Sequence, residues 1–289
     1  MYYGLIILSV AMFGGGFALN DVYRKMRGSS LRISMESYLV GSVAGLVCLL
    51  IFSGTTFDVS LFTVIMALIA TLNAIILTFF TFKALDSVNL SLYSLFSMLG
   101  GMMLPFIQGI IFYNEGFTLA KAVAIALIFI SLALTVDLRN GRGGLLYCIG
   151  VFILNGLSGV ITKLYNELPF EKASPAGYSV WIAIFSIIIS GLLLLLLFTR
   201  KDETNSQKYT LKVCTVGAAS GAVNKVANFI LVISLLHVET SVQYPLVTGG
   251  VIIVSTLICF FGSRKPTKRE LLSVIIAFLG TLALFVIPS

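Results

Sequence analysis

A short polar stretch inside a long apolar run holds the chain's first candidate for chemistry. It reads Ser220-Gly-Ala-Val-Asn224-Lys225-Val-Ala-Asn228 and lies in the middle of the run 211–236. A cation at the centre of a lipid bilayer costs about 3 kcal/mol on insertion scales, so it persists there only when it faces protein or a water-filled cavity. Lys225 is therefore expected to bind a substrate group.

Asparagines accompany this cation. Asn73, Asn155 and Asn224 each fall near the middle of an apolar run, and Asn228 follows Asn224 by one helical turn, on the same face. A buried amide can join two helices by hydrogen bonds worth about 0.6–2 kcal/mol, or it can contact a substrate. Both roles are open for a single asparagine, but the grouping around Lys225 favours one shared polar cavity near the bilayer midplane.

Two tyrosines, Tyr93 and Tyr244, occupy similar places near the beginnings of two apolar runs. Aromatic side chains in such places commonly lie at the membrane interface. Polar neighbours such as Ser94 and Gln243 favour a second role, in gating or substrate contact. Both tyrosines are therefore included among the candidate substrate-binding residues.

The residue types missing from the apolar runs narrow the substrate. No Asp or Glu lies centrally in any of them, and a pump for lipophilic cations usually needs a buried carboxylate. The substrate is expected to be anionic, zwitterionic, or neutral with many hydrogen-bonding sites. No glycine-rich phosphate loop, metal-ligand spacing or nucleic-acid-binding surface occurs, so no cofactor, metal site, nucleic-acid partner or ATP-driven step is expected.

One motif raises an enzymatic alternative. The segment Gly156-Leu-Ser158-Gly159 matches the GxSG nucleophile motif of rhomboid-type intramembrane proteases. That chemistry also needs a histidine base within hydrogen-bonding reach. His237 is the one histidine of the chain, and the glycine spacing expected after it is missing. Ser158 is therefore expected to pack between helices, and no enzymatic activity or catalytic residue is predicted.

The composition indicates which elements position these residues. The chain of 289 residues is 58% hydrophobic and 11% charged, whereas soluble domains are about 25% charged. Apolar runs of about 20 residues are long enough to cross a bilayer, where only helices or closed barrels are stable, and these runs lack the alternation of barrel strands. An all-α membrane protein is predicted, with ten transmembrane helices at about 2–23, 31–53, 60–82, 88–112, 118–136, 144–166, 176–199, 211–236, 240–262 and 270–287.

The ten helices divide into two similar units. Asn73 precedes Asn224 by 151 positions, and the same offset relates Tyr93 to Tyr244. Residues 1–140 and 141–289 are therefore predicted to be repeats of five helices each. Because five is odd, the second unit enters the membrane from the opposite side. The result is a 5+5 inverted repeat, an arrangement that supports alternating access to a midplane site.

This organisation resembles the drug/metabolite transporter superfamily, in its EamA-type branch. The resemblance rests on ten short-looped spans in two sets of five, on small residues in the fourth and ninth spans, and on a Glu115-Gly116 turn before the fifth. It implies export or exchange of metabolites through a cavity lined by spans 1, 3, 4, 6, 8 and 9. The second half departs from the pattern, with Arg264-Lys265-Pro266 where a Glu-containing turn is expected.

The leading functional hypothesis is a secondary active transporter of a small polar metabolite, anionic, zwitterionic or amino-acid-like. Its partners are the small-molecule substrate, the lipid bilayer, and a proton or a counter-substrate for coupling. The expected location is the cell membrane, as a multi-pass protein of the bacterial inner-membrane type. One alternative is a drug efflux transporter. An alternative of another class is a membrane scaffold or accessory subunit without a pathway.

The positive charges predict the orientation. Most of the 19 Lys and Arg residues fall in one set of loops, and the opposite set holds Lys121, Lys163 and Lys172. Cytoplasmic loops carry an excess of Lys and Arg, so both termini are predicted to face outward. The family resemblance implies cytoplasmic termini instead. We give the charges precedence, because they act on the insertion of this chain itself.

Overall fold

The chain is almost entirely helical. The computed structural model describes residues 2–53, 58–113, 118–135, 142–198, 210–235, 238, 240–262 and 264–286, and within them it contains ten α-helices and no β-strand. Each of the ten expected spans coincides with one of them, which confirms the all-α prediction. The helices are α1 (Tyr2–Arg27), α2 (Leu31–Ser53), α3 (Leu61–Ser87), α4 (Leu90–Phe112), α5 (Leu119–Thr135), α6 (Arg142–Glu167), α7 (Pro175–Phe198), α8 (Leu211–Leu235), α9 (Thr240–Phe260) and α10 (Lys268–Val286).

Seven of these helices are long and apolar enough to cross a membrane, judged within the described residues by length and composition. They are α1, α2, α3, α4, α6, α7 and α8. Two further stretches, Leu119–Leu134 in α5 and Pro245–Phe260 in α9, are apolar but shorter.

Polar caps and one glycine set several helix ends. Ser60 accepts a hydrogen bond from the Thr63 amide at 3.1 Å and begins α3, and Asn89 accepts one from the Leu92 amide at 2.9 Å and begins α4. Gly28 adopts a φ of 107°, a left-handed conformation that ends α1 and suits glycine. These residues make short turns between consecutive helices.

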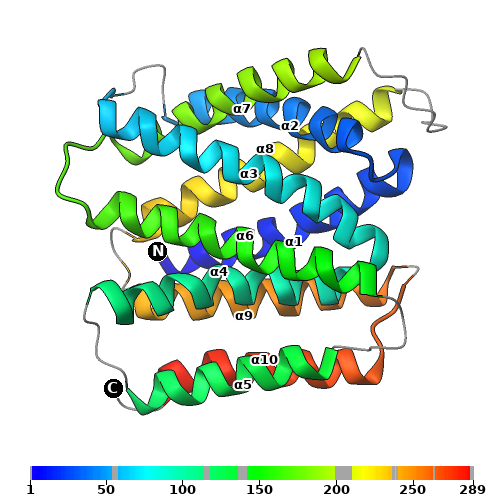
Figure 1. Ribbon diagram of the computed structural model, residues 1–289, viewed down its shortest axis with the longest axis vertical. Helices are drawn as coiled ribbons and strands as arrows, with labels where there is room; N and C mark the ends of the chain where they lie inside the picture. Colours follow the sequence, from blue (N-terminus) through cyan, green and yellow to red (C-terminus); the bar gives the residue numbers. More distant parts are fainter. Residues whose placement is uncertain are drawn as a thin grey trace.

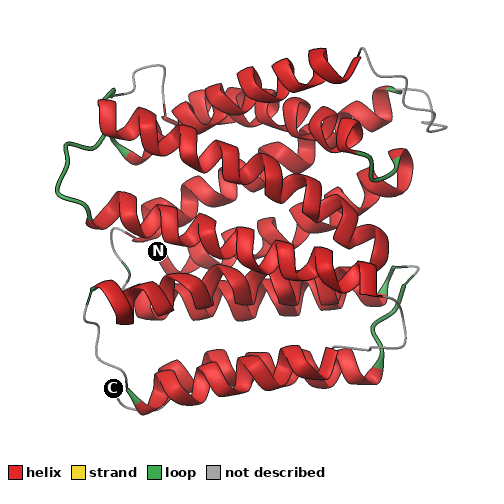
Figure 2. Ribbon diagram, viewed as in Figure 1, coloured by secondary structure: helices red, strands yellow, loops and turns green. Residues whose placement is uncertain are grey.

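The helices run back and forth, so that α1 begins and α10 ends at the same end of the bundle (Figures 1 and 2). We call this the terminal end. The opposite end, which holds Gly28, Asn89 and Arg264, we call the basic end. Helices α2 and α7 lie along one edge of the bundle, and α5 and α10 lie along the other (Figure 1).

The packing partners follow a regular scheme. Helix α2 packs against α7, α4 against α9, and α5 against α10. Helix α8 packs against both α1 and α2, whereas α6 packs against both α3 and α4. Two further contacts, between α1 and α9 and between α3 and α7, complete the set of main interfaces.

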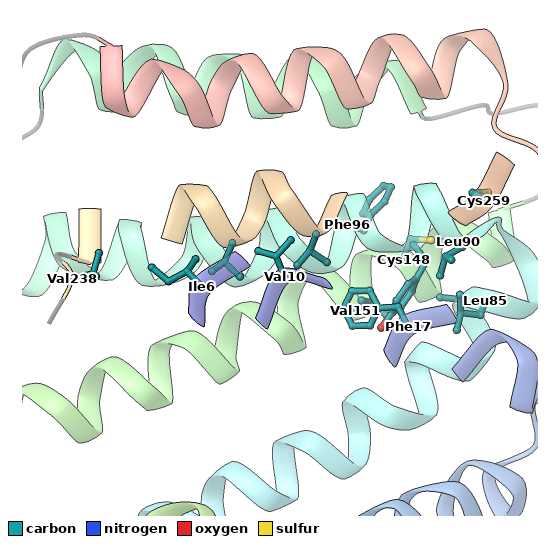
Figure 3. Packing of buried hydrophobic residues seen from close by; sticks show 14 residues of the cluster. Ile6, Val10, Phe17, Leu85, Leu90, Phe96, Cys148, Val151, Val238 and Cys259 are labelled. Carbon is teal, nitrogen blue, oxygen red and sulfur yellow. The ribbon is translucent and has the colours of Figure 1, made fainter. Parts of the chain in front are cut away.

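The largest apolar cluster lies where α1, α4, α6 and α9 meet (Figure 3). It includes Ile6 and Val10 of α1, Phe96 of α4 and Val151 of α6, all of them buried. These four helices therefore share one packed apolar core.

Candidate functional site

Lys225 lies where α8 meets α2 and α7. The methylenes of its side chain pack against Gly45 of α2, where an added Cβ would lie 3.1 Å from Lys225 Cγ. Its ammonium nitrogen lies 5.8 Å from the centre of the Tyr38 ring, and the Tyr38 hydroxyl is 2.9 Å from the Ser186 hydroxyl of α7. No carboxylate pairs with Lys225 within the described part of the chain. The cation is thus available to an anionic group.

Asn224 and Asn228 lie on the neighbouring face of α8. The Asn224 amide nitrogen donates to the Ser220 carbonyl at 2.8 Å, and the amide packs against Gly16 of α1. The Asn228 amide nitrogen donates to the Asn224 carbonyl at 2.9 Å, and Asn228 itself is exposed. Asn224 is therefore engaged in a helix contact, whereas Asn228 keeps an accessible amide.

The exposed Asn228 is on the inner side of α8. The side of the helix around Asn228 contacts α1 through Ser220, whose hydroxyl donates to the Gly16 carbonyl at 3.3 Å, and contacts α2 where Gly221 meets Gly41. Thr215, which is also exposed, lies about 140° around the helix from Asn228, away from these contacts. Asn228 is therefore exposed between α1 and α2.

The other two asparagines join helices. The Asn73 amide nitrogen of α3 donates to the Leu154 carbonyl at 2.9 Å and to the Ser158 hydroxyl at 2.8 Å, both in α6. The Asn155 amide nitrogen donates to the Ser97 carbonyl of α4 at 2.6 Å. These are interhelical hydrogen bonds of the kind that hold membrane helices together. A role for Asn73 or Asn155 in substrate binding stays a prediction.

The structure thus places the candidates in two groups. Asn73 of α3 and Asn155 of α6 lie where α3, α4 and α6 meet, and Asn224, Lys225 and Asn228 lie on α8. Within the described residues, no hydrogen bond joins the two groups. Ser158, the serine of the GxSG motif, accepts from Asn73 and donates to the Leu154 carbonyl at 3.2 Å.

Tyr93 is a core residue. Its side chain is buried, its ring packs edge-on against Phe17 with the ring centres 5.1 Å apart, and its hydroxyl is 3.2 Å from the Thr81 hydroxyl. Its side chain therefore packs between helices. The side chain of Tyr244 lies outside the described residues, as do His237 and the Glu115-Gly116 turn.

Two polar residues have roles that the sequence analysis missed. Arg24 lies in the last turn of α1, where it is buried and pairs with Asp21 and Asp86. The spacing of Asp21 and Arg24 by three residues was a signal for part of this cluster. Gln243 is also buried, and its amide nitrogen donates to the Leu231 carbonyl of α8 at 2.9 Å.

The comparisons with known proteins concern the fold alone. No known family and no curated protein matches the chain. The structure resembles 28 solved chains. One of them, described as the crystal structure of a protein, has a TM-score of 0.61 and 13% sequence identity, over 97% of this chain and 99% of that one. The chain therefore shares its fold with a solved protein over nearly the whole length of both.

Proposed function

We propose that the chain is a membrane-embedded secondary transporter, in which residues 1–140 and 141–289 form an inverted repeat. The observation that carries this proposal is the pairing of helix contacts. The contact of α1 with α8 has a counterpart in that of α6 with α3, and the contact of α4 with α6 has one in that of α9 with α1. In each pair, one contact is converted into the other when α1 is exchanged with α6, α3 with α8 and α4 with α9.

Individual residues support the same correspondence. Gly100 of α4 lies directly against the Phe152 backbone of α6, and Gly250 of α9 lies against Val10 of α1, where an added Cβ would be 2.8 Å from Val10 Cγ1. Gly250 follows Gly100 by 150 residues, which is the offset from α4 to α9. Phe152 follows Val10 by 142 residues, which is the offset from α1 to α6.

A second pair of contacts has the same offsets. A Cβ added at Gly156 would lie 2.7 Å from Leu104 Cδ2, and one added at Gly14 would lie 2.5 Å from Val254 Cγ1. Two independent contacts in one register favour a true structural repeat. This register would place Gln243, and not Tyr244, at the position equivalent to Tyr93.

The asparagines fit this scheme as structural equivalents. Asn73 contacts Ser158 of α6, and Asn224 contacts Gly16 of α1. The two contacted residues, Gly16 and Ser158, are again 142 residues apart. Because α1 runs from the terminal end and α6 from the basic end (Figure 1), the two units have opposite directions. Inverted units around a central polar region are the arrangement that secondary transporters use for alternating access.

The substrate class follows from Lys225. An ammonium without a carboxylate partner in the described residues is suited to a carboxylate or phosphate group, and such a charge-assisted bond is stronger than a neutral one. Asn228, one turn away and accessible, could hydrogen-bond a second polar group of the same molecule. We therefore favour a small anionic or zwitterionic metabolite, including amino-acid-like compounds, exchanged for a proton or a counter-substrate.

Flux measurements in sealed vesicles test this function. Purified protein is reconstituted, and the uptake of labelled organic anions, amino acids and organic cations is compared with uptake by protein-free vesicles. We expect flux of an anionic or zwitterionic compound that competes with its unlabelled form. A scaffold or accessory subunit would show no flux of any class, and selective flux of cations would contradict the role given to Lys225.

A further inference from the structure

The two ends of the bundle are closed to different extents. Near the basic end, α1 packs against α3. The repeat scheme relates these helices to α6 and α8, which make at most marginal contact among the described residues. An inverted repeat whose halves were in the same conformation would show both contacts. The α1–α3 contact is therefore a feature in which the two halves differ.

An ion pair between the buried Arg24 and the half-exposed Asp86 links α1 to α3. Arg24 of α1 is 7% exposed, and its guanidinium donates to Asp86 of α3 at 2.7 Å and to Asp21 of its own helix at 2.9 Å. Asp86 also accepts from the Ser29 hydroxyl at 3.1 Å, and its backbone carbonyl accepts from Arg264 at 2.9 Å. One aspartate thus links α3 to α1 and to the segment that follows α9.

An aromatic layer lies next to these charges. Tyr23 of α1 and Phe82 of α3 are both fully buried, and their rings meet edge to face with centres 5.9 Å apart. Tyr23 also packs against α8, where a Cβ added at Gly217 would lie 2.9 Å from the ring. The Tyr23 ring therefore joins α1, α3 and α8 at the basic end.

Among the residues that the structure describes, the terminal end lacks an equivalent ionic link. The offset of 142 residues relates Arg24 to Asn166, which is exposed. It also relates Tyr23 to Tyr165, whose hydroxyl lies 3.1 Å from that of Thr63 and donates to the Ala173 carbonyl at 3.0 Å. These bonds join α6 to α3 and to the start of α7, and α8 takes no part in them. Asn228, in the half of α8 toward this end, is exposed.

We propose that the Arg24–Asp86 pair is a gate at the basic end, closed in this structure, while the polar residues of α8 are accessible from the terminal end. The proposal rests on the proposed transport function. Opening requires that α1 separate from α3 and that the guanidinium leave Asp86. The exchange of states would then bring α6 toward α8, because inverted repeats alternate by exchanging the conformations of their halves.

Cysteine labelling can test the gate without a known substrate. Cys48, Cys148, Cys214 and Cys259 are first replaced by Ser. Asn20→Cys then reports on the region one turn inside Arg24, and Asn228→Cys reports on the opposite opening. A maleimide that cannot cross membranes is applied to sealed vesicles of known orientation, from each side in turn, and the labelling rates are measured.

We expect Asp86→Asn to raise the rate at Asn20→Cys from the basic end at least tenfold, and to lower the rate at Asn228→Cys from the terminal end. Lys25→Gln is the matched control, since Lys25 pairs at 2.7 Å with Asp21 within α1 and forms no ion pair with another helix among the described residues. It should leave both rates unchanged. Equal rates in Asp86→Asn and Lys25→Gln would overturn the gate.

A milder variant guards against misfolding of Asp86→Asn. Arg24→Lys keeps the charge but loses the planar fork that reaches two carboxylates together, and we expect at least a threefold rise at Asn20→Cys. Unchanged labelling in this variant as well would exclude the gate. The absence of flux for every substrate class would instead count against transport, since the labelling rates do not depend on a substrate.

Discussion

The Lys225 ammonium faces the Tyr38 ring at 5.8 Å, and the Tyr38 hydroxyl is bonded to Ser186 of α7. Cation–π contacts contribute about 0.5–2 kcal/mol, depending on how far the cation is removed from water. This contact holds the cation at the meeting point of α2, α7 and α8 without neutralising its charge. An anionic substrate group could therefore approach Lys225 without displacing a carboxylate.

Replacement of Lys225 should remove transport. We expect Lys225→Ala to lower the initial rate of flux by about 10- to 100-fold, the value of one charge-assisted hydrogen bond. Lys225→Arg should retain little activity, because a site that fits a compact ammonium need not accept a planar guanidinium. Flux in vesicles, normalised to protein amount, measures both effects. Wild-type rates in both variants would show that Lys225 is structural.

The Tyr38 ring and its hydroxyl can be tested separately. Tyr38→Phe keeps the aromatic face and loses the bond to Ser186, so the apparent affinity should change less than about twofold. Tyr38→Leu removes the aromatic face and should change it about fivefold, in line with about 1 kcal/mol for the cation–π contact. The concentration dependence of flux gives both values. A larger effect in Tyr38→Phe would mean that the hydroxyl, and not the ring, matters for the site.

Asn73 and Asn228 should separate stability from function. Asn73→Ala removes two interhelical hydrogen bonds and should destabilise the protein by about 1 kcal/mol, seen as a lower Tm in detergent. Asn228→Ala removes a bond within α8 from an exposed side chain, so Tm should stay unchanged while flux falls. The opposite pattern, with Tm lowered in Asn228→Ala alone, would reverse the two roles.

Close helix packing predicts a contrast between two glycines. An added Cβ at Gly100 would clash with the Phe152 backbone, whereas one at Gly15 meets no atom within 4 Å. Gly100→Ala should therefore destabilise the protein by about 1–3 kcal/mol. Gly15→Ala should stabilise it by about 0.5–1 kcal/mol through its better helix propensity. Thermal unfolding of both variants provides the measurement, and equal Tm values would contradict this view of the α4–α6 contact.

The orientation of the chain can be decided by labelling intact cells. The excess of Lys and Arg in one set of loops predicts outward-facing termini. A reagent that cannot cross the membrane should modify Ser289→Cys and leave Ser206→Cys unmodified, in a background without the native cysteines. Modification of Ser206→Cys alone would place the termini in the cytoplasm, as the family resemblance implies.

Helices were easier to predict from the sequence than their ends. Apolar runs of about 20 residues identified all ten, because such runs are stable in lipid only as helices or barrels. The first run was predicted to end at about residue 23, but α1 continues to Arg27, before the left-handed Gly28. The charges of this last turn have partners in the fold: Arg24 and Lys25 pair with Asp21, and Arg27 pairs with Glu36.

The candidate site could be predicted only in part. Position within a run identified the polar residues, but it does not reveal which neighbouring helix each one faces, and Asn73 proved to be bonded to α6. The pair of Arg24 and Asp86 was not predictable, since its members are 62 residues apart. Its existence depends on the packing of α1 against α3, for which a single sequence carries no local signal.

The meeting of Gly41 and Gly221 bears on how α8 could move. Each glycine leaves no room for a Cβ on the other, so the backbones of α2 and α8 touch there without interlocking side chains. A crossing of this kind has no ridges that resist rotation. Helix α8 could tilt about that point, and a tilt moves the two ends of a rigid rod in opposite directions. A small inward displacement of its beginning, near Tyr23, would carry the segment around Asn228 outward by a similar amount.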